Sequence, residues 1–128
     1  MVVKDYLSAM MNDIMNCKKA NKKETVVIPA TKLLLEVLKI MKKNEFIKDF
    51  RVEEDKFKKI IIEIGKLNKC NSIKPRFYVK KKEIYKYIER YLPSRNIGVL
   101  IISTNKGLMT QHEVIEKNIG GSLIAYCY

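Results

Sequence analysis

Apolar and polar residues alternate along this chain with two spacings, one that repeats about every 3.6 residues and one that repeats every second residue. The helical spacing occurs twice in the first half, directly after Asp5 and directly after Thr31, two residues that favour the N-cap of a helix. The apolar positions are Leu7, Met10, Met11 and Ile14 in the first predicted helix and Leu34, Val37, Leu38 and Met41 in the second. Each helix therefore has one face for a core and one for solvent.

Strand-like stretches separate and follow these two helices. Strands are expected at 25–28, 46–53 and 56–64. Pro29 ends the first of them, and an acidic turn at 53–55 joins the other two. The first half is thus predicted to form one sheet with helices packed on a face.

The second half has more strand-like segments and fewer helical ones. Its expected elements are a strand at 73–79, a helix at 81–91, a strand at 98–102, a short helix at 110–118 and a final strand at 122–128. Thr110 and Glu113 have the spacing of a capping box, and Gly120-Gly121 is expected to end the short helix. We predict an α+β fold of two small lobes, residues 1–65 and 73–128, joined by a polar connection at 66–72.

The composition shows one outlying quantity, the charge. Lys and Arg number 26 against 14 Asp and Glu, which gives a net charge of +12 in a chain of 128 residues. A surface of this kind attracts polyanions and favours phosphate contacts. The alternative is that the lysines reflect nucleotide bias and form ordinary solvated faces.

The cysteines and the first residues indicate the compartment. Cys17, Cys70 and Cys127 are far apart and include no Cys-x-x-Cys pair, so neither a disulfide framework nor a zinc site is indicated. This usage favours a reducing compartment. The start of the chain lacks an apolar leader and no run has membrane-spanning length, so we expect a soluble, cytoplasmic protein without a membrane partner.

One stretch places small hydrogen-bonding side chains directly after an apolar strand. Ser103, Thr104 and Asn105 follow 98–102, and Gly107 permits a sharp bend or the close approach of another backbone. Two polar turns, 103–107 and 120–122, can then lie side by side on one surface. The plain alternative is an ordinary connection from strand to helix.

Several separated motifs resemble one family. The run Ser103-Thr104-Asn105-Lys106-Gly107-Leu108-Met109-Thr110 is similar to the signature Ser-Thr-Ser/Thr-x-Gly-x-Met-Ser/Thr of the small-subunit ribosomal protein S8 family. The segments 120–121 and 125–128 are also similar to this family, and the segments 65–70, 74–79 and 92–95 resemble its archaeal and eukaryotic branch. The resemblance extends over essentially the whole chain, more weakly before Gly65.

The resemblance implies a structural constituent of the small ribosomal subunit. Such a protein binds an irregular helix in the central domain of small-subunit ribosomal RNA, promotes assembly and has neighbouring ribosomal proteins as further partners. The residues implied for RNA binding are Ser103, Thr104, Asn105, Lys106, Gly107, Met109, Gly120, Gly121, Ser122, Tyr78, Arg76, Thr31 and Lys32. Asn105 and Ser122 depart from the usual family pattern. No cofactor, metal or small-molecule substrate is implied.

Two of these positions have equally simple structural interpretations. Tyr78 can stack on a base or sugar, or it can be a strand tyrosine packed between the lobes. Thr31 and Lys32 can hold a phosphate at a helix N-terminus, or Thr31 can be a plain N-cap.

Other classes of function have weaker support. His112 is the single histidine, and no nucleotide loop, paired ligand motif or nucleophile with a base accompanies it, so we do not expect an enzyme. A protein-interaction module is the other alternative, because the terminal strand 123–128 can offer an edge and Tyr126 and Tyr128 can anchor a neighbour. A basic RNA-binding or interaction module without a ribosomal role also remains open.

Overall fold

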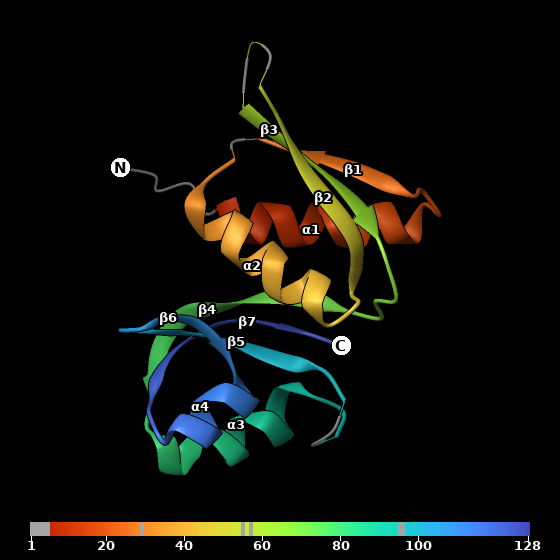
Figure 1. Cartoon of the computed structure of the whole chain (residues 1–128). Coiled ribbons are helices and arrows are strands. Elements are labelled where there is room, and N and C mark those ends of the chain that lie inside the picture. Colours follow the sequence, from red (N-terminus) through yellow and green to blue (C-terminus); the bar gives the residue numbers. More distant parts are fainter. Residues whose placement is uncertain (1–5, 29, 55, 57, 95–96) are drawn as a thin grey trace. The chain divides into compact units, whose positions relative to one another are not determined.

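The chain folds into two compact units, residues 1–69 and 70–128. Each unit combines helices with one antiparallel sheet, so the predicted α+β class is confirmed (Figure 1). This computed structural model describes residues 6–28, 30–54, 56, 58–94 and 97–128, without the side chains of 74–76. Within those ranges, no helix is long and apolar enough to cross a membrane.

The first unit has two helices and three strands. They are α1 (Tyr6–Lys19), β1 (Glu24–Val27), α2 (Lys32–Lys43), β2 (Ile47–Glu54) and β3 (Lys58–Ile64). The sheet has the order β1-β3-β2, and both pairings are antiparallel. Strand β2 runs to Glu54, so Glu53 and Glu54 belong to a strand rather than to the expected turn, and Asp55 lies outside the described residues.

The core of the first unit consists of the two predicted apolar stripes and one face of β3. All eight stripe residues are at most 1% exposed, as are Ile60 and Ile62. Burial of one large aliphatic side chain contributes about 1.5–3 kcal/mol, so these stripes are what stabilises both helices on the sheet. The hydroxyl of Thr31 accepts a hydrogen bond from the Leu34 amide at 3.3 Å, which confirms this N-cap. The other expected cap, Asp5, and the strand-ending Pro29 lie outside the described residues.

The second unit has four strands and three helical segments. They are β4 (Cys70–Val79), the 3₁₀ turn η1 (Lys81–Glu83), α3 (Ile84–Tyr91), β5 (Val99–Thr104), β6 (Gly107–Thr110), α4 (Gln111–Lys117) and β7 (Gly121–Cys127). The sheet order is β4-β7-β5-β6, and the helices α3 and α4 lie against one face of it (Figure 1). The core on that side contains Leu100, Ile102, Met109, Val114 and Leu123.

Three features of this unit differ from the sequence-based expectation. Strand β7 is central, between β4 and β5, so the proposed free edge at 123–128 is wrong. Strand β6 was not expected, because its four residues lie within a polar stretch that reads as a loop. Helix α4 ends where expected, with Asn118 as its C-cap, but the residue that terminates it is Asn118 in the left-handed conformation with φ 58° and not Gly120-Gly121.

A buried glutamine joins β6 to α4 without a loop. Gln111 is 0% exposed. Its side-chain oxygen accepts from the Leu100 amide at 2.8 Å, and its side-chain nitrogen donates to the Gly98 carbonyl at 3.0 Å. These bonds continue the β5–β6 ladder beyond its last backbone pair, Ile101 with Thr110. The backbone is thereby free to turn into a helix at once, and Thr110 caps that helix by accepting from the Glu113 amide.

The three cysteines are buried and form no disulfide. Cys70 in β4 lies opposite Cys127 in β7. Burial raises the pKa of the Cys70 thiol to about 12 and that of Cys127 well above its ordinary value. Both thiols are therefore protonated and unreactive in the folded protein.

Candidate nucleic-acid interface

A groove of about 390 Å³ opens at one end of the second unit's sheet. Its lining residues are Tyr78, Ser103, Thr104, Asn105, Ile119, Gly120, Gly121 and Ser122. None of them carries a charged side chain at neutral pH, and Lys106 follows Asn105 at the exposed turn. The groove is thus a neutral, polar surface with a cation beside it.

Strand register explains why residues distant in sequence meet here. Ser122 in β7 is paired with Tyr78 in β4 on one side and with Ser103 in β5 on the other. Directly paired residues point to the same face of an antiparallel sheet. Tyr78, Ser122 and Ser103 therefore form a row across three strands. The prediction that the two polar segments lie side by side is confirmed.

The turn between β5 and β6 is closed by Thr104. Its hydroxyl donates to the Gly107 carbonyl at 2.7 Å and accepts from the Lys106 amide at 3.1 Å. Asn105 and Lys106 form the tip of this turn, and Gly107, with φ 109°, begins β6 directly opposite Thr104 without a register shift. Thr104 thus fixes the shape of the turn, and its donor is already used within the protein.

Other polar side chains at the groove remain available to a ligand. Across the part of the chain that the structure describes, the side chains of Ser103, Asn105 and Ser122 make no hydrogen bond. Ser103 and Ser122 are half-buried at the groove, while Asn105 is exposed at the turn. They offer three short side chains that can both donate and accept, held on a rigid sheet.

Two glycines form the floor of the groove because no larger residue fits there. A Cβ atom at Gly120 would lie 2.6 Å from the Val79 carbonyl oxygen and 2.9 Å from the Tyr78 hydroxyl. A Cβ atom at Gly121 would lie 2.6 Å from the Ser103 carbonyl oxygen. The strands can approach this closely only without side chains at these positions, and the Tyr78 ring then covers Gly120.

Tyr78 presents its ring to solvent. It is 66% exposed and lies near the end of β4, an edge strand of the sheet. An exposed aromatic ring beside free hydroxyl groups is a suitable surface for stacking. Tyr78 is therefore not a core residue of the second unit, and its two expected roles, stacking on RNA and packing between the lobes, stay predictions.

The remaining predicted residues are distributed as follows. Met109 is 5% exposed, belongs to the core and does not line the groove. Thr31 and Lys32 are part of the first unit, where Thr31 caps α2 and Lys32 is exposed. The side chain of Arg76 is not among those described. Ile119 lines the groove and was missed, because nothing in its sequence context distinguishes it from a core residue.

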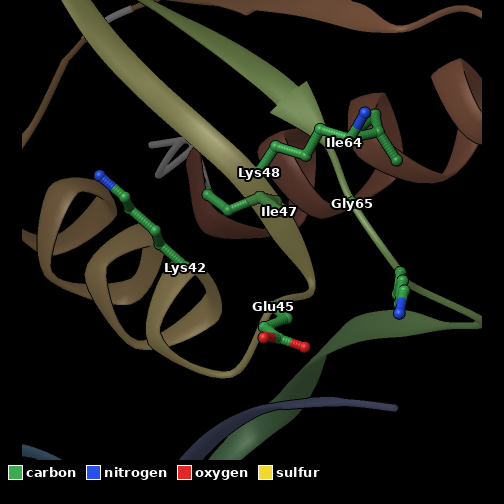
Figure 2. Close-up of a pocket in the computed structure, with 7 residues that line it drawn as sticks. Lys42, Glu45, Ile47, Lys48, Ile64 and Gly65 are labelled. Carbon is green, nitrogen blue, oxygen red and sulfur yellow. The ribbon is translucent and has the colours of Figure 1, made fainter.

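The first unit has a hollow of its own, with a volume of about 540 Å³ (Figure 2). Its lining residues are Lys42, Glu45, Ile47, Lys48, Ile64, Gly65 and Lys66. Figure 2 shows the amino groups of Lys42 and Lys48 pointing away from each other, and Lys42 is paired with Asp49 at 2.9 Å. These two lysines do not converge on one point, so the hollow is not built around a single anion.

The sequence is similar to known proteins over its full length. Residues 5–128 match the family described as "Ribosomal protein S8". A curated relative from Desulfurococcus amylolyticus, the small ribosomal subunit protein uS8, is 43% identical over 133 residues. That match covers all of this chain and all of the relative.

Proposed function

This chain belongs to the ribosomal protein S8 family and is a structural constituent of the small ribosomal subunit, and on that premise we propose that its groove binds ribosomal RNA. The single observation that carries the proposal is the row of Tyr78, Ser122 and Ser103 across three strands. Its place of action is the subunit in the cytoplasm.

The chemistry of the row suits the shallow minor groove of an RNA helix. That surface displays 2′-hydroxyl groups and base edges, which short side chains with both a donor and an acceptor can reach. Ser103, Ser122 and Asn105 supply such groups, and Gly120 and Gly121 let the strands that carry them pack closely together. An irregular helix, with an unpaired base or widened groove, presents more of these edges and offers a base for Tyr78 to stack on.

The positive charge and the shape of the groove contribute to different steps of RNA binding. The net charge of +12 speeds encounter with RNA and supplies phosphate contacts, and Lys106 is an exposed cation at the turn beside the groove. Phosphate contacts do not choose a site, so site choice belongs to the neutral groove. Because Thr104 closes the turn before RNA arrives, little ordering is needed on binding.

The finer parts of the proposal concern the RNA and the outcome of binding. We place the bound helix in the central domain of the small-subunit RNA, where locking it promotes assembly with neighbouring proteins. In this proposal the protein acts by binding alone.

The test compares two double variants with the unaltered protein in binding a central-domain RNA fragment and a scrambled duplex. Ser103→Ala/Asn105→Ala removes two free side chains of the site, and Asn12→Ala/Asn16→Ala removes two exposed amides on α1 as a control. Two hydrogen bonds at about 0.5–1.5 kcal/mol each predict a loss of about tenfold or more for the first variant only. The salt dependence should stay unchanged, because no cation is removed.

If the site variant binds the cognate fragment as tightly as the control does, or if both RNAs bind equally to every form, the groove does not read RNA.

A further inference from the structure

The outer face of the first unit's sheet is open and has an ordered arrangement of charges. We use "outer face" for Glu24, Val26, Asp49, Arg51, Glu53, Lys59, Ile61 and Glu63, which register places on the side of the sheet opposite the core. Glu24, Glu63 and Asp49 form one row across β1, β3 and β2. The next row is Val26, Ile61 and Arg51.

The acidic row is only partly neutralised from within. Arg51 lies 3.8 Å from Glu24 and 3.9 Å from Glu63, and these side chains are 38–53% exposed. Glu24 and Glu63 are directly opposed, a cross-strand pairing of like charges that destabilises a sheet. Asp49 bonds to Lys42 from α2, which lowers the pKa of that carboxyl and keeps it ionised. The row is therefore anionic at neutral pH.

The net charge of the outer face is opposite in sign to the net charge of the whole chain. The face holds four carboxylates and two cations, a net charge of −2, on a protein of net charge +12. Such a surface repels RNA phosphates. Beside the acidic row, Val26 is 50% exposed on β1, an edge strand of the sheet. An exposed valine next to carboxylates matches the aliphatic stem and charged head of a long basic side chain.

We propose that the outer face is a docking surface for a lysine- or arginine-rich segment of another protein. The cationic heads meet Glu24 and Glu63, and the aliphatic stems lie over the exposed Val26. The surface is distinct from the RNA groove, which belongs to the second unit. In the part of the chain that is described, no group of acidic, histidine or cysteine residues could hold a metal ion, so a bound cation is not the occupant.

The test is a titration of the full-length, isotope-labelled protein with a short synthetic peptide of alternating arginine and leucine, followed by amide chemical shifts. A matched peptide of alternating glutamate and leucine is the probe control. We expect shifts at Val26, Ile61 and Glu63 with the basic peptide only. Affinity should fall as salt rises, because exposed charge pairs are screened.

Two variants with the same change in net charge distinguish binding at the outer face from a general effect of net charge. Glu24→Gln/Glu63→Gln should lower the affinity for the basic peptide roughly three- to tenfold, as expected for two exposed ion pairs. Glu89→Gln/Glu116→Gln, on exposed positions of α3 and α4, should leave it unchanged. The first variant should keep about the stability of the parent, because it removes a repulsive pair together with two exposed contacts to Arg51.

Three results would overturn the proposal. Equal weakening by both variants would mean that only net charge matters. Loss of RNA affinity in Glu24→Gln/Glu63→Gln would assign the face to RNA, a question separate from the Ser103 and Asn105 test. A concentration-dependent dimer that this variant abolishes, seen by sedimentation, would identify the occupant as a second copy of the chain.

Discussion

Replacing Thr104 by valine tests whether this residue shapes the turn between β5 and β6 or contacts RNA directly. Valine keeps the volume and the branched shape but removes the hydroxyl that bonds to Gly107 and Lys106. A neutral hydrogen bond contributes about 0.5–1.5 kcal/mol net, and both bonds are exposed, so water replaces part of the loss. We therefore expect a destabilisation of about 1 kcal/mol.

The variant Ser103→Ala is expected to behave differently from Thr104→Val in stability. The Ser103 side chain makes no hydrogen bond to any residue that the structure describes, so its removal should change the free energy of unfolding by less than about 0.5 kcal/mol. Thr104→Val should lower both stability and RNA affinity, whereas Ser103→Ala should lower RNA affinity alone. Thr104→Ser keeps the hydroxyl and is the control.

The assays are urea unfolding and fluorescence anisotropy with a labelled central-domain RNA fragment. The reasoning is refuted if Thr104→Val leaves the unfolding free energy unchanged yet costs as much RNA affinity as Ser103→Ala. In that case the Thr104 hydroxyl contacts RNA directly and does not hold the turn.

Three further predictions concern the groove and the core. Gly120→Ala should destabilise the protein by about 1–3 kcal/mol in urea unfolding, because the new Cβ would lie 2.6 Å from a backbone carbonyl. Tyr78→Ala should cost about 1–3 kcal/mol of RNA affinity in the anisotropy assay and little stability, because the ring is 66% exposed. Stability should fall as pH rises above about 9, because the unfolded Cys70 thiol then ionises while the folded one, with a pKa of about 12, keeps its proton. Cys70→Ala should reduce this loss, as measured by unfolding at pH 8 and pH 10.

Local features of the fold were predictable because short-range sequence patterns determine them. The apolar stripe from Leu34 to Met41 and the cap at Thr31 need only residues within one helix to be recognised. The same holds for the cap at Thr110, whose partner Glu113 is three residues away.

The register of the second sheet was not predictable in this way. Ser122 meets Tyr78 and Ser103 only because β7 inserts between β4 and β5, and no local pattern states which strands become neighbours. The hydrogen bonds that the Thr104 hydroxyl makes within the turn were not predicted, for a related reason. Its partner is a backbone carbonyl at Gly107, and composition carries no signal for such a bond.

The side chain of Gln111 limits where this protein can tolerate added residues. Strand β6 ends at Thr110 and α4 begins at the next residue, so no slack segment exists between them. One residue inserted there would pull the amide away from Leu100 and Gly98 and rotate the helix by about 100°, since a helix has about 3.6 residues per turn. A change of length at this junction would therefore break the bonds that hold α4 to β5 and move the helix relative to the sheet.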